Sequence, residues 1–378
     1  MSTERPGPDR PRPNDDVWPG RVLGGKYRLT ARIGQGSTGS VYSAVQQPLG
    51  RTVAVKVLDL VDASSQMQSL AKARFLREAS LLSQLSHPNT VRIFDYGTFE
   101  EHSWLAMELC RGQSLATLMG DRPMDPLRLI RIVGQVCGSL QEAHELGLIH
   151  RDLKPANILV ETAEDGSDRA KVVDFGLVKP FNDSEQLTAR GLLVGTPMFM
   201  SPEQVRGRSD IDPRSDLYAL GVLLYRGLTG EYPFEQTSIA NVLIAHVKDA
   251  PRKFPTLTDV PRSLQRLVSL LLEKDRNRRP DTVATVAHQL QLIERVLQGE
   301  LTDAMVLSAI EPTSLAALSQ SGSVMRSGPR LPMAPPPPTT ITRTLRLVAV
   351  LGLGLALTGF IAMSSGYFVA QMYWLYTE

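Results

Sequence analysis

The chain has 378 residues and a formal net charge of +2, from 41 Lys and Arg against 39 Asp and Glu. So balanced a charge argues against a protein that binds nucleic acid by neutralising phosphates, and we expect no nucleic-acid partner. The length fits two or three ordinary domains, or one two-lobed enzyme with tails. Both cysteines, Cys110 and Cys137, lie in apolar stretches without metal-ligand spacing, which predicts buried thiols in a reducing compartment.

Residues 1–20 are rich in proline, aspartate and arginine and contain no apolar core segment, which predicts a disordered tail and not a secretory signal peptide. From 21 to about 109, β-branched and polar residues alternate, and one helical stretch is expected between about 68 and 85. The clearest strands fall at 27–33, 41–45 and 52–58. This pattern predicts a small unit rich in strands.

Gly34, Gly36 and Gly39 form a G-x-G-x-x-G pattern within this unit. Glycines let the backbone amides of such a loop approach the phosphates of a nucleotide. A dinucleotide-binding fold uses similar glycines, but there a helix follows the loop. Here Val41 begins a run that is typical of a strand, so we expect the loop to lie within a hairpin.

Lys56 stands in the apolar run 53–57, where an unpaired charge would be costly, so it needs a partner. Glu78 is the expected partner, because it shares one face of the predicted helix with Phe75 and Leu82. These residues alone do not distinguish a catalytic ion pair from a purely structural one.

The second unit, from 110 to about 297, places apolar residues at three- and four-residue spacing, which predicts mostly helices. Gly147 is expected to end one of them. Residues 150–160 then read H-R-D-L-K-P-A-N-I-L-V, and the run D-F-G follows at 174–176. The two motifs in this order do not arise by chance.

These motifs resemble those of eukaryotic-type serine/threonine protein kinases, which in bacteria include membrane-anchored forms, and the resemblance covers about residues 27–290. It implies an α+β, bilobal protein kinase fold, with a β-rich N-lobe at about 21–109 and a helical C-lobe at about 110–297. It also implies transfer of the γ-phosphate of ATP to serine and threonine hydroxyls of proteins, including the chain itself. The implied cofactors are ATP and Mg²⁺, with Mn²⁺ as an alternative.

The resemblance implies four catalytic residues. Lys56, paired with Glu78, would hold the α- and β-phosphates of ATP. Asp152 would orient the substrate hydroxyl and accept its proton. Lys154 would neutralise charge on the transferred phosphate, and a lysine at this position is typical of kinases that act on serine and threonine.

The same resemblance implies the cofactor site. Asp174 and Asn157 would hold the metal ions, since Mg²⁺ prefers oxygen ligands. The backbone of Glu108 and Cys110 would meet the adenine in a hinge between the lobes, with Met107 behind it. The full set of residues expected to contact ATP is Ile33, Gly34, Gln35, Gly36, Ser37, Thr38, Gly39, Val41, Ala54, Lys56, Met107, Glu108, Cys110 and Asn157.

Downstream, residues 195–197 and 201–203 resemble the end of an activation segment. The resemblance implies an ion pair between Glu203 and Arg279 that holds the fold, and an acid, Asp216, that supports the catalytic-loop backbone. Arg151 precedes the catalytic aspartate, where kinases of this family often bind a phosphate on the activation segment. Thr188 is the first candidate for autophosphorylation and Ser184 the second.

The C-terminal part predicts a membrane anchor. Residues 298–346 are rich in Ser, Ala and Pro, which is typical of a flexible juxtamembrane linker. Residues 347–369 carry no charge and, at about 1.5 Å per helical residue, slightly exceed a hydrocarbon core of about 30 Å. Residues 370–378 form a short external tail, too short for a sensory domain. A fully buried soluble helix is the alternative.

Arg343 and Arg346 directly precede this segment, which predicts that the kinase domain faces the cytoplasm, and we favour a bacterial inner membrane. Gly352 and Ala356 have the small-x-x-x-small spacing that allows membrane helices to pack closely. A homodimer formed through these helices is therefore one of the arrangements that the sequence allows. The expected partners are therefore ATP, protein substrates and the lipid bilayer. A membrane-anchored pseudokinase scaffold is the alternative function, although the residues that catalysis needs are all present.

Overall fold

The computed structural model describes residues 17–36, 39–58, 65–100, 102–175, 197–234, 238–255 and 259–310. The predicted membrane segment 347–369 and the phosphorylation candidates Ser184 and Thr188 lie outside these ranges. Among the described helices, none is long and apolar enough to cross a bilayer.

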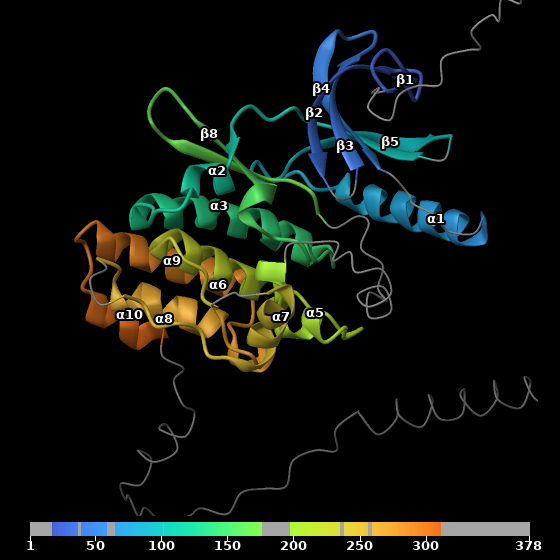
Figure 1. Cartoon of the computed structure of the whole chain (residues 1–378). Helices are drawn as coiled ribbons and strands as arrows, with labels where there is room; N and C mark the ends of the chain where they lie inside the picture. The colour runs from blue at the N-terminus through green and yellow to red at the C-terminus, as the bar shows by residue number, and fades with distance from the viewer. Residues whose placement is uncertain are drawn as a thin grey trace, which may run out of the picture. The chain divides into compact units, whose positions relative to one another are not determined.

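The N-terminal lobe is built on an antiparallel sheet of six strands in the order β1-β2-β3-β4-β6-β5 (Figure 1). The strands are β1 (Val22–Leu23), β2 (Tyr27–Gly36), β3 (Gly39–Gln46), β4 (Arg51–Leu58), β5 (Ile93–Phe99) and β6 (His102–Met107). Helix α1 (Ser65–Leu82) packs against β5 and β6. The three strands and the helix predicted from the sequence are confirmed, each within a few residues.

From Val53 onward, strand β4 is buried on both faces, which explains why Lys56 is the one polar residue in its apolar run. Val53, Val55 and Val57 belong to one hydrophobic cluster. Ala54 and Leu58 face the opposite side and pack in a second cluster that includes residues of α1. Lys56 lies between Ala54 and Leu58 along the strand and is only 9% exposed. Its charge is therefore held close to the apolar interior.

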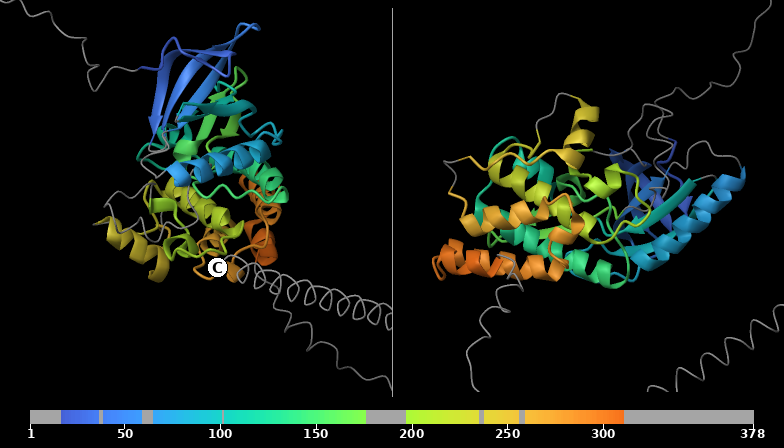
Figure 2. Two further views of the ribbon diagram at one scale, coloured as in Figure 1. Left: turned by 90° about the vertical axis from the view of Figure 1, so that its right-hand side faces the viewer. Right: turned by 90° about the horizontal axis from the view of Figure 1, so that it is seen from below.

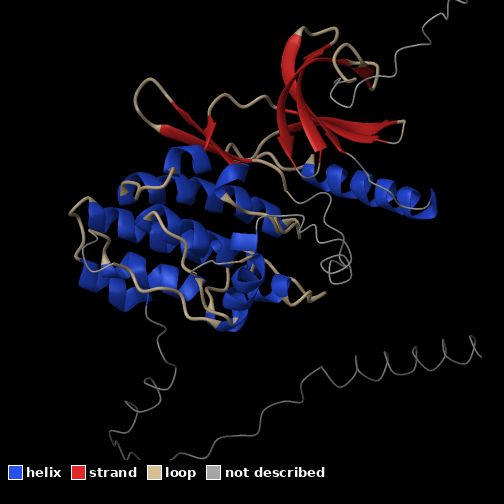
Figure 3. Ribbon diagram, viewed as in Figure 1, coloured by secondary structure: helices blue, strands red, loops and turns tan. Residues whose placement is uncertain are grey.

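The C-terminal lobe is mostly helical, as Figure 3 shows, with one small sheet of β7 (Gln113–Ser114), β8 (Ile158–Thr162) and β9 (Asp168–Val172). Its helices are α2 (Leu115–Met119), α3 (Pro126–Glu145), α5 (Pro202–Val205), α6 (Arg214–Thr229), α7 (Ile239–Lys248), α8 (Arg262–Leu271), α9 (Val283–Leu297) and α10 (Asp303–Ile310). Short 3₁₀ turns lie at Pro155–Asn157, Pro197–Phe199 and Arg276–Arg278. Helix α6 is buried along most of its length and contacts α3 and α8, so the lobe is organised around it.

The folded region continues past residue 297, where the composition predicts a linker. Val306 and Ile310 of α10 are buried, and the views in Figure 2 show α10 beside α8 and α9. The carboxylate of Asp303 accepts hydrogen bonds from the backbone N–H groups of Arg262 and Ser263, at 2.8 and 3.0 Å. Residues 303–310 therefore belong to the folded domain.

The segment between α1 and β5 is fastened to the C-terminal lobe. The carboxylate of Glu142 on α3 accepts hydrogen bonds from the backbone N–H groups of Ser86 and His87, each at 2.9 Å. Val91 donates its backbone N–H to the carbonyl of Val172 at 3.0 Å. The first two contacts hold this segment on α3, and the third joins it to the end of β9.

His246 on α7 is fully buried, and its Nδ1 lies 2.8 Å from the hydroxyl of Tyr218. Burial, with the nearby ammonium group of Lys274, lowers the pKa of His246 to about 3. The pKa of histidine in an unfolded chain is about 6.5. Between these values the unfolded state binds one proton more than the folded state, so stability falls as the pH decreases below about 6.5.

Between pH 7.5 and 5.5, the free energy of unfolding of the wild type should fall by about 1.4 kcal/mol more than that of His246→Gln, because glutamine does not titrate. Urea unfolding of both proteins at the two pH values measures this difference. His288→Gln, at an exposed position of α9, is the control and should keep the wild-type pH effect. An unchanged pH effect in His246→Gln would contradict the prediction.

Candidate functional site

The glycine pattern lies in the hairpin between β2 and β3, where Gly36 and Gly39 are paired. This confirms a strand after the loop and excludes the dinucleotide-binding alternative. Gly39 has a φ of +141°, and a Cβ at this position would lie 2.0 Å from the carbonyl oxygen of Val57. Only glycine fits there, because the start of β3 lies directly against the backbone of β4, with which it pairs. Ser37 and Thr38 lie outside the described residues.

Beneath the hairpin, the residues predicted to line an adenine form one apolar surface. Val41, Ala54, Met107 and Cys110 all belong to one hydrophobic cluster. Ala54 and Met107 are paired across β4 and β6, which fixes their spacing. Ile33 on β2 is 51% exposed. Gly34, Gln35 and Gly36 lie on the same strand.

The predicted hinge follows β6. The backbone N–H of Glu108 donates to the carbonyl of Arg92 at 2.8 Å. A ligand in the hinge would therefore bind the backbone of Glu108 through its carbonyl group. The Glu108 carboxylate pairs with Lys171 of β9 at 2.8 Å, a contact that the sequence did not predict. Cys137 is buried as predicted, but Cys110 is only half-buried, so that part of the prediction is wrong. Burial and then Glu108 raise the pKa of Cys110 to about 11, which makes it a poor nucleophile.

Lys56 and Asp174 form an ion pair across the two lobes, with Nζ 2.9 Å from Oδ2. Asp174 has a φ of +58°, a left-handed conformation that is uncommon outside glycine. Glu78 is half-buried on α1, and its pairing with Lys56 stays a prediction. The contact between Lys56 and Asp174 was not predicted, because nothing in the sequence relates the two positions.

Three predicted residues of the loop before β8 come together. Asp152 Oδ2 accepts a hydrogen bond from Lys154 Nζ at 2.9 Å and one from Asn157 Nδ2 at 3.2 Å. The same Nδ2 donates to the backbone carbonyl of Asp152 at 2.8 Å. The amide nitrogen of Asn157 therefore faces Asp152, which leaves its amide oxygen to bind a cation.

The backbone of this loop is held by Asp216, at the start of α6, as predicted. Asp216 accepts from the N–H groups of His150 and Arg151, at 2.9 and 3.0 Å, and lies 2.8 Å from His144 Nε2. Burial favours the neutral acid, but His144 and His150 together lower the pKa of Asp216. His144 was missed, although its place in the last turn of the predicted helix α3 was a signal for a contact at that helix end.

His150 links the loop to the residues around Asp174. Its Nε2 lies 3.1 Å from the carbonyl of Val173, and its Nδ1 accepts from the N–H of Asp152 at 3.3 Å. Because a carbonyl can only accept, Nε2 carries the proton. Burial lowers the pKa of His150, which keeps the ring neutral. The ring also packs against Phe175, with centroids 4.6 Å apart.

The predicted ion pair between Glu203 and Arg279 is confirmed. Arg279 donates two hydrogen bonds to Glu203, at 2.7 and 2.9 Å, and the Ser215 hydroxyl adds a third at 2.8 Å. Burial opposes ionisation, but Arg279 lowers the pKa of Glu203. The pair fastens α5 to the turn before α9. Residues 176 and 195–196 of the neighbouring motifs lie outside the described ranges.

The donors gathered here suit a hard divalent cation. Asp174 offers a carboxylate and Asn157 an amide oxygen, and Mg²⁺ is commonly bound by few protein oxygens together with phosphate groups and water. Within the described ranges, no cluster of three or more His, Cys, Asp or Glu residues forms a separate metal site. The residues therefore fit a metal that a phosphate ligand would share.

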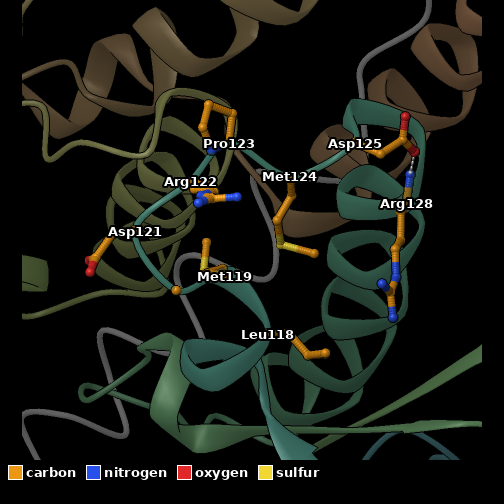
Figure 4. A pocket seen from close by; sticks show the side chains of 9 residues that line it. Leu118, Met119, Asp121, Arg122, Pro123, Met124, Asp125 and Arg128 are labelled. Atoms are coloured by element: carbon orange, nitrogen blue, oxygen red, sulfur yellow. Dashed lines mark hydrogen bonds between the residues drawn. The ribbon is translucent and has the colours of Figure 1, made fainter.

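A cavity of about 530 Å³ lies elsewhere, at the connection between α2 and α3 (Figure 4). Arg122 and Met124 line it, while Asp125 accepts a hydrogen bond from the backbone N–H of Arg128 at 2.7 Å. None of the predicted site residues lines this cavity. It is separate from the loop that contains Asp152.

Comparison with known proteins matches residues 27–291 to the protein kinase domain. Serine/threonine-protein kinase pkn3 of Myxococcus xanthus is 39% identical over 292 residues, which cover 75% of this chain and 52% of that protein. The DNA damage-responsive serine/threonine-protein kinase RqkA of Deinococcus radiodurans is 36% identical, over 74% of this chain and 41% of that protein. Serine/threonine-protein kinase PknJ of Mycobacterium tuberculosis is 34% identical, over 80% of this chain and 51% of that protein. The chain thus spans about half the length of these curated relatives, or less.

Among solved structures, the kinase domain of Mycobacterium tuberculosis PknI aligns with a TM-score of 0.57 over 74% of this chain and all of that domain, at 24% identity. At this identity the likeness shows the fold. It confirms the predicted arrangement of a strand-rich and a helical lobe.

Proposed function

We propose that this chain, which belongs to the protein kinase family, transfers the γ-phosphate of ATP to serine and threonine hydroxyls of proteins. One observation carries the proposal: Asp152, Lys154 and Asn157 converge in one loop, and Asp174 pairs with Lys56. Phosphoryl transfer depends on positioning and charge neutralisation, and this group combines a base, two cations and two oxygen ligands for a metal.

Each residue has a distinct part in the proposed reaction. Asp152 orients the substrate hydroxyl and accepts its proton, while Lys154, hydrogen-bonded to it, stabilises charge on the transferred phosphate. Lys56 holds the α- and β-phosphates, with Glu78 as its partner. Asn157 and Asp174 hold Mg²⁺, or Mn²⁺ in its place. The metal, when bound, neutralises charge on the phosphate oxygens.

The adenine is proposed to lie on the apolar surface of Val41, Ala54 and Met107. The carbonyl of Glu108 accepts a hydrogen bond from the base, and the N–H of Cys110 donates one. A planar group suits this surface because the paired strands β4 and β6 present small and unbranched side chains there.

Transfer of labelled phosphate tests the function. The full chain is incubated with ATP and Mg²⁺, alone and with a generic basic protein, beside Asp152→Asn. A protein that ends after Ile310 keeps every described contact and serves as a soluble form. Label on serine or threonine that disappears in the variant supports the proposal. Binding of ATP without any transfer would favour the pseudokinase scaffold instead.

We also propose that residues 347–369 anchor the chain as a single-pass membrane helix, with the kinase domain in the cytoplasm of a bacterium. The support is the charge-free stretch and the preceding Arg343 and Arg346. Membrane fractionation of the full chain and of a protein that ends after Ile310 tests this. A full chain that stays in the soluble fraction would contradict it. Crosslinking in the same membranes tests whether the anchor forms a homodimer.

A further inference from the structure

The side chain of Gln204 joins two segments that lie far apart in the sequence. Its Nε2 donates a hydrogen bond to the backbone carbonyl of Arg151 at 2.8 Å. Its Oε1 accepts one from the backbone N–H of Ser201 at 2.9 Å. A carbonyl only accepts and an N–H only donates, so the two partners together determine how the amide is oriented.

The carbonyl that Gln204 holds belongs to a strained residue. Arg151 has a φ of +60°, a left-handed conformation that a side chain disfavours and that persists only when its surroundings enforce it. Its N–H donates to Asp216 at 3.0 Å, and its carbonyl accepts from Gln204. The residue is therefore held at both of its peptide groups, and the second of these is the peptide that leads into Asp152.

The surroundings give little room for a substitute. Between Asp152, Phe199, Gln204 and Asp216 lies a cavity of only about 10 Å³. A water needs about 10 to 15 Å³ of such space and several polar partners. The cavity therefore leaves room for at most about one water beside the amide of Gln204.

We propose that Gln204 is a positioning residue for the transfer reaction. It ties the backbone at Ser201, where helix α5 begins, to the peptide that orients Asp152. The backbone at Ser201 thereby supports the geometry of the catalytic aspartate. The inference rests on the proposed kinase function. Gln204 touches no reacting atom, so its loss should lower kcat with little effect on the KM for ATP.

Two substitutions in the full chain separate the contacts of Gln204. Gln204→Met keeps the size of the side chain and removes both hydrogen bonds. Gln204→Glu keeps an acceptor for Ser201 but turns an oxygen toward the carbonyl of Arg151. Both variants should lose about 10- to 100-fold in kcat, since small misplacements of catalytic groups have effects of up to about 10²-fold.

Gln135 on α3 offers a matched control. It also donates to a backbone carbonyl, that of Asp168 at 2.8 Å, and accepts from a backbone N–H, that of Ala170 at 2.8 Å. Its Oε1 accepts one further hydrogen bond, from Asn89 Nδ2 at 2.9 Å. The two backbone partners lie on β9, away from the loop of Asp152. Gln135→Met should lose thermal stability to a similar extent as Gln204→Met but keep kcat close to that of the wild type.

Hydrogen–deuterium exchange gives a readout that does not depend on activity. Gln204→Met should speed exchange at 151–153 and 201, whereas Gln135→Met should speed it at 168–172. Wild-type exchange at 151–153 in Gln204→Met, a wild-type kcat in that variant, or a fully active Gln204→Glu would overturn the inference. If the wild type itself transfers no phosphate, the proposed function fails, and the exchange result still decides whether Gln204 holds the loop.

Discussion

Asp174→Asn is expected to lower the rate of phosphate transfer about a thousandfold while the protein stays folded. The substitution keeps the shape of the side chain but removes the charge that pairs with Lys56 and that would bind a divalent cation. Losing one such electrostatic contact typically costs a factor of about 10² to 10³. We expect the upper end of this range because the same carboxylate serves both Lys56 and the cation. Transfer rates and the affinity for ATP, each measured with and without Mg²⁺, test the prediction.

The matched control is Asp165→Asn. Asp165 is an exposed aspartate in the turn between β8 and β9, where it accepts hydrogen bonds from Ser167. Its replacement changes the net charge by the same amount without touching the candidate site, so transfer should be unchanged. If Asp174→Asn transferred phosphate as fast as this control, Asp174 would not be the residue that holds the metal.

The sequence predicted those parts of the site that a short motif or one helical face specifies. The strands around Lys56 and the helix that ends just before Gly147 follow from local periodicity, which needs no knowledge of the tertiary fold. The support of the catalytic loop by Asp216 and the pair between Glu203 and Arg279 followed from the family resemblance, and the structure contains both.

Contacts between distant segments could not be predicted in this way. The pairing of Lys56 with Asp174 and the hydrogen bond from Gln204 to Arg151 depend on how the lobes and loops pack, which no local pattern encodes. Helix α10 was hidden for another reason. Its two buried residues, Val306 and Ile310, stand in a stretch whose composition resembles a linker, and only their packing against α8 and α9 reveals a helix of the domain.

The pair between Glu203 and Arg279 is expected to have the largest effect on stability. Their side chains are only 5% and 0% exposed, and Arg279 also donates to the backbone carbonyls of Glu273 and Arg214, at 2.8 and 2.9 Å. Arg279→Leu would leave a buried carboxylate without its cation. We therefore expect a loss of about 3 to 5 kcal/mol in the free energy of unfolding, measured with urea on the protein that ends after Ile310.

The control Arg131→Leu removes an ion pair of the same length, 2.7 Å to Glu294, but with the arginine side chain 50% exposed, so it should cost less than about 1 kcal/mol. Equal losses in the two variants would contradict the prediction. The double variant with Glu203→Leu and Arg279→Leu separates charge from packing. Because it removes both buried charges, it should recover part of the stability that Arg279→Leu loses. No recovery would mean that the carbonyls held by Arg279, and not its charge, make the larger contribution.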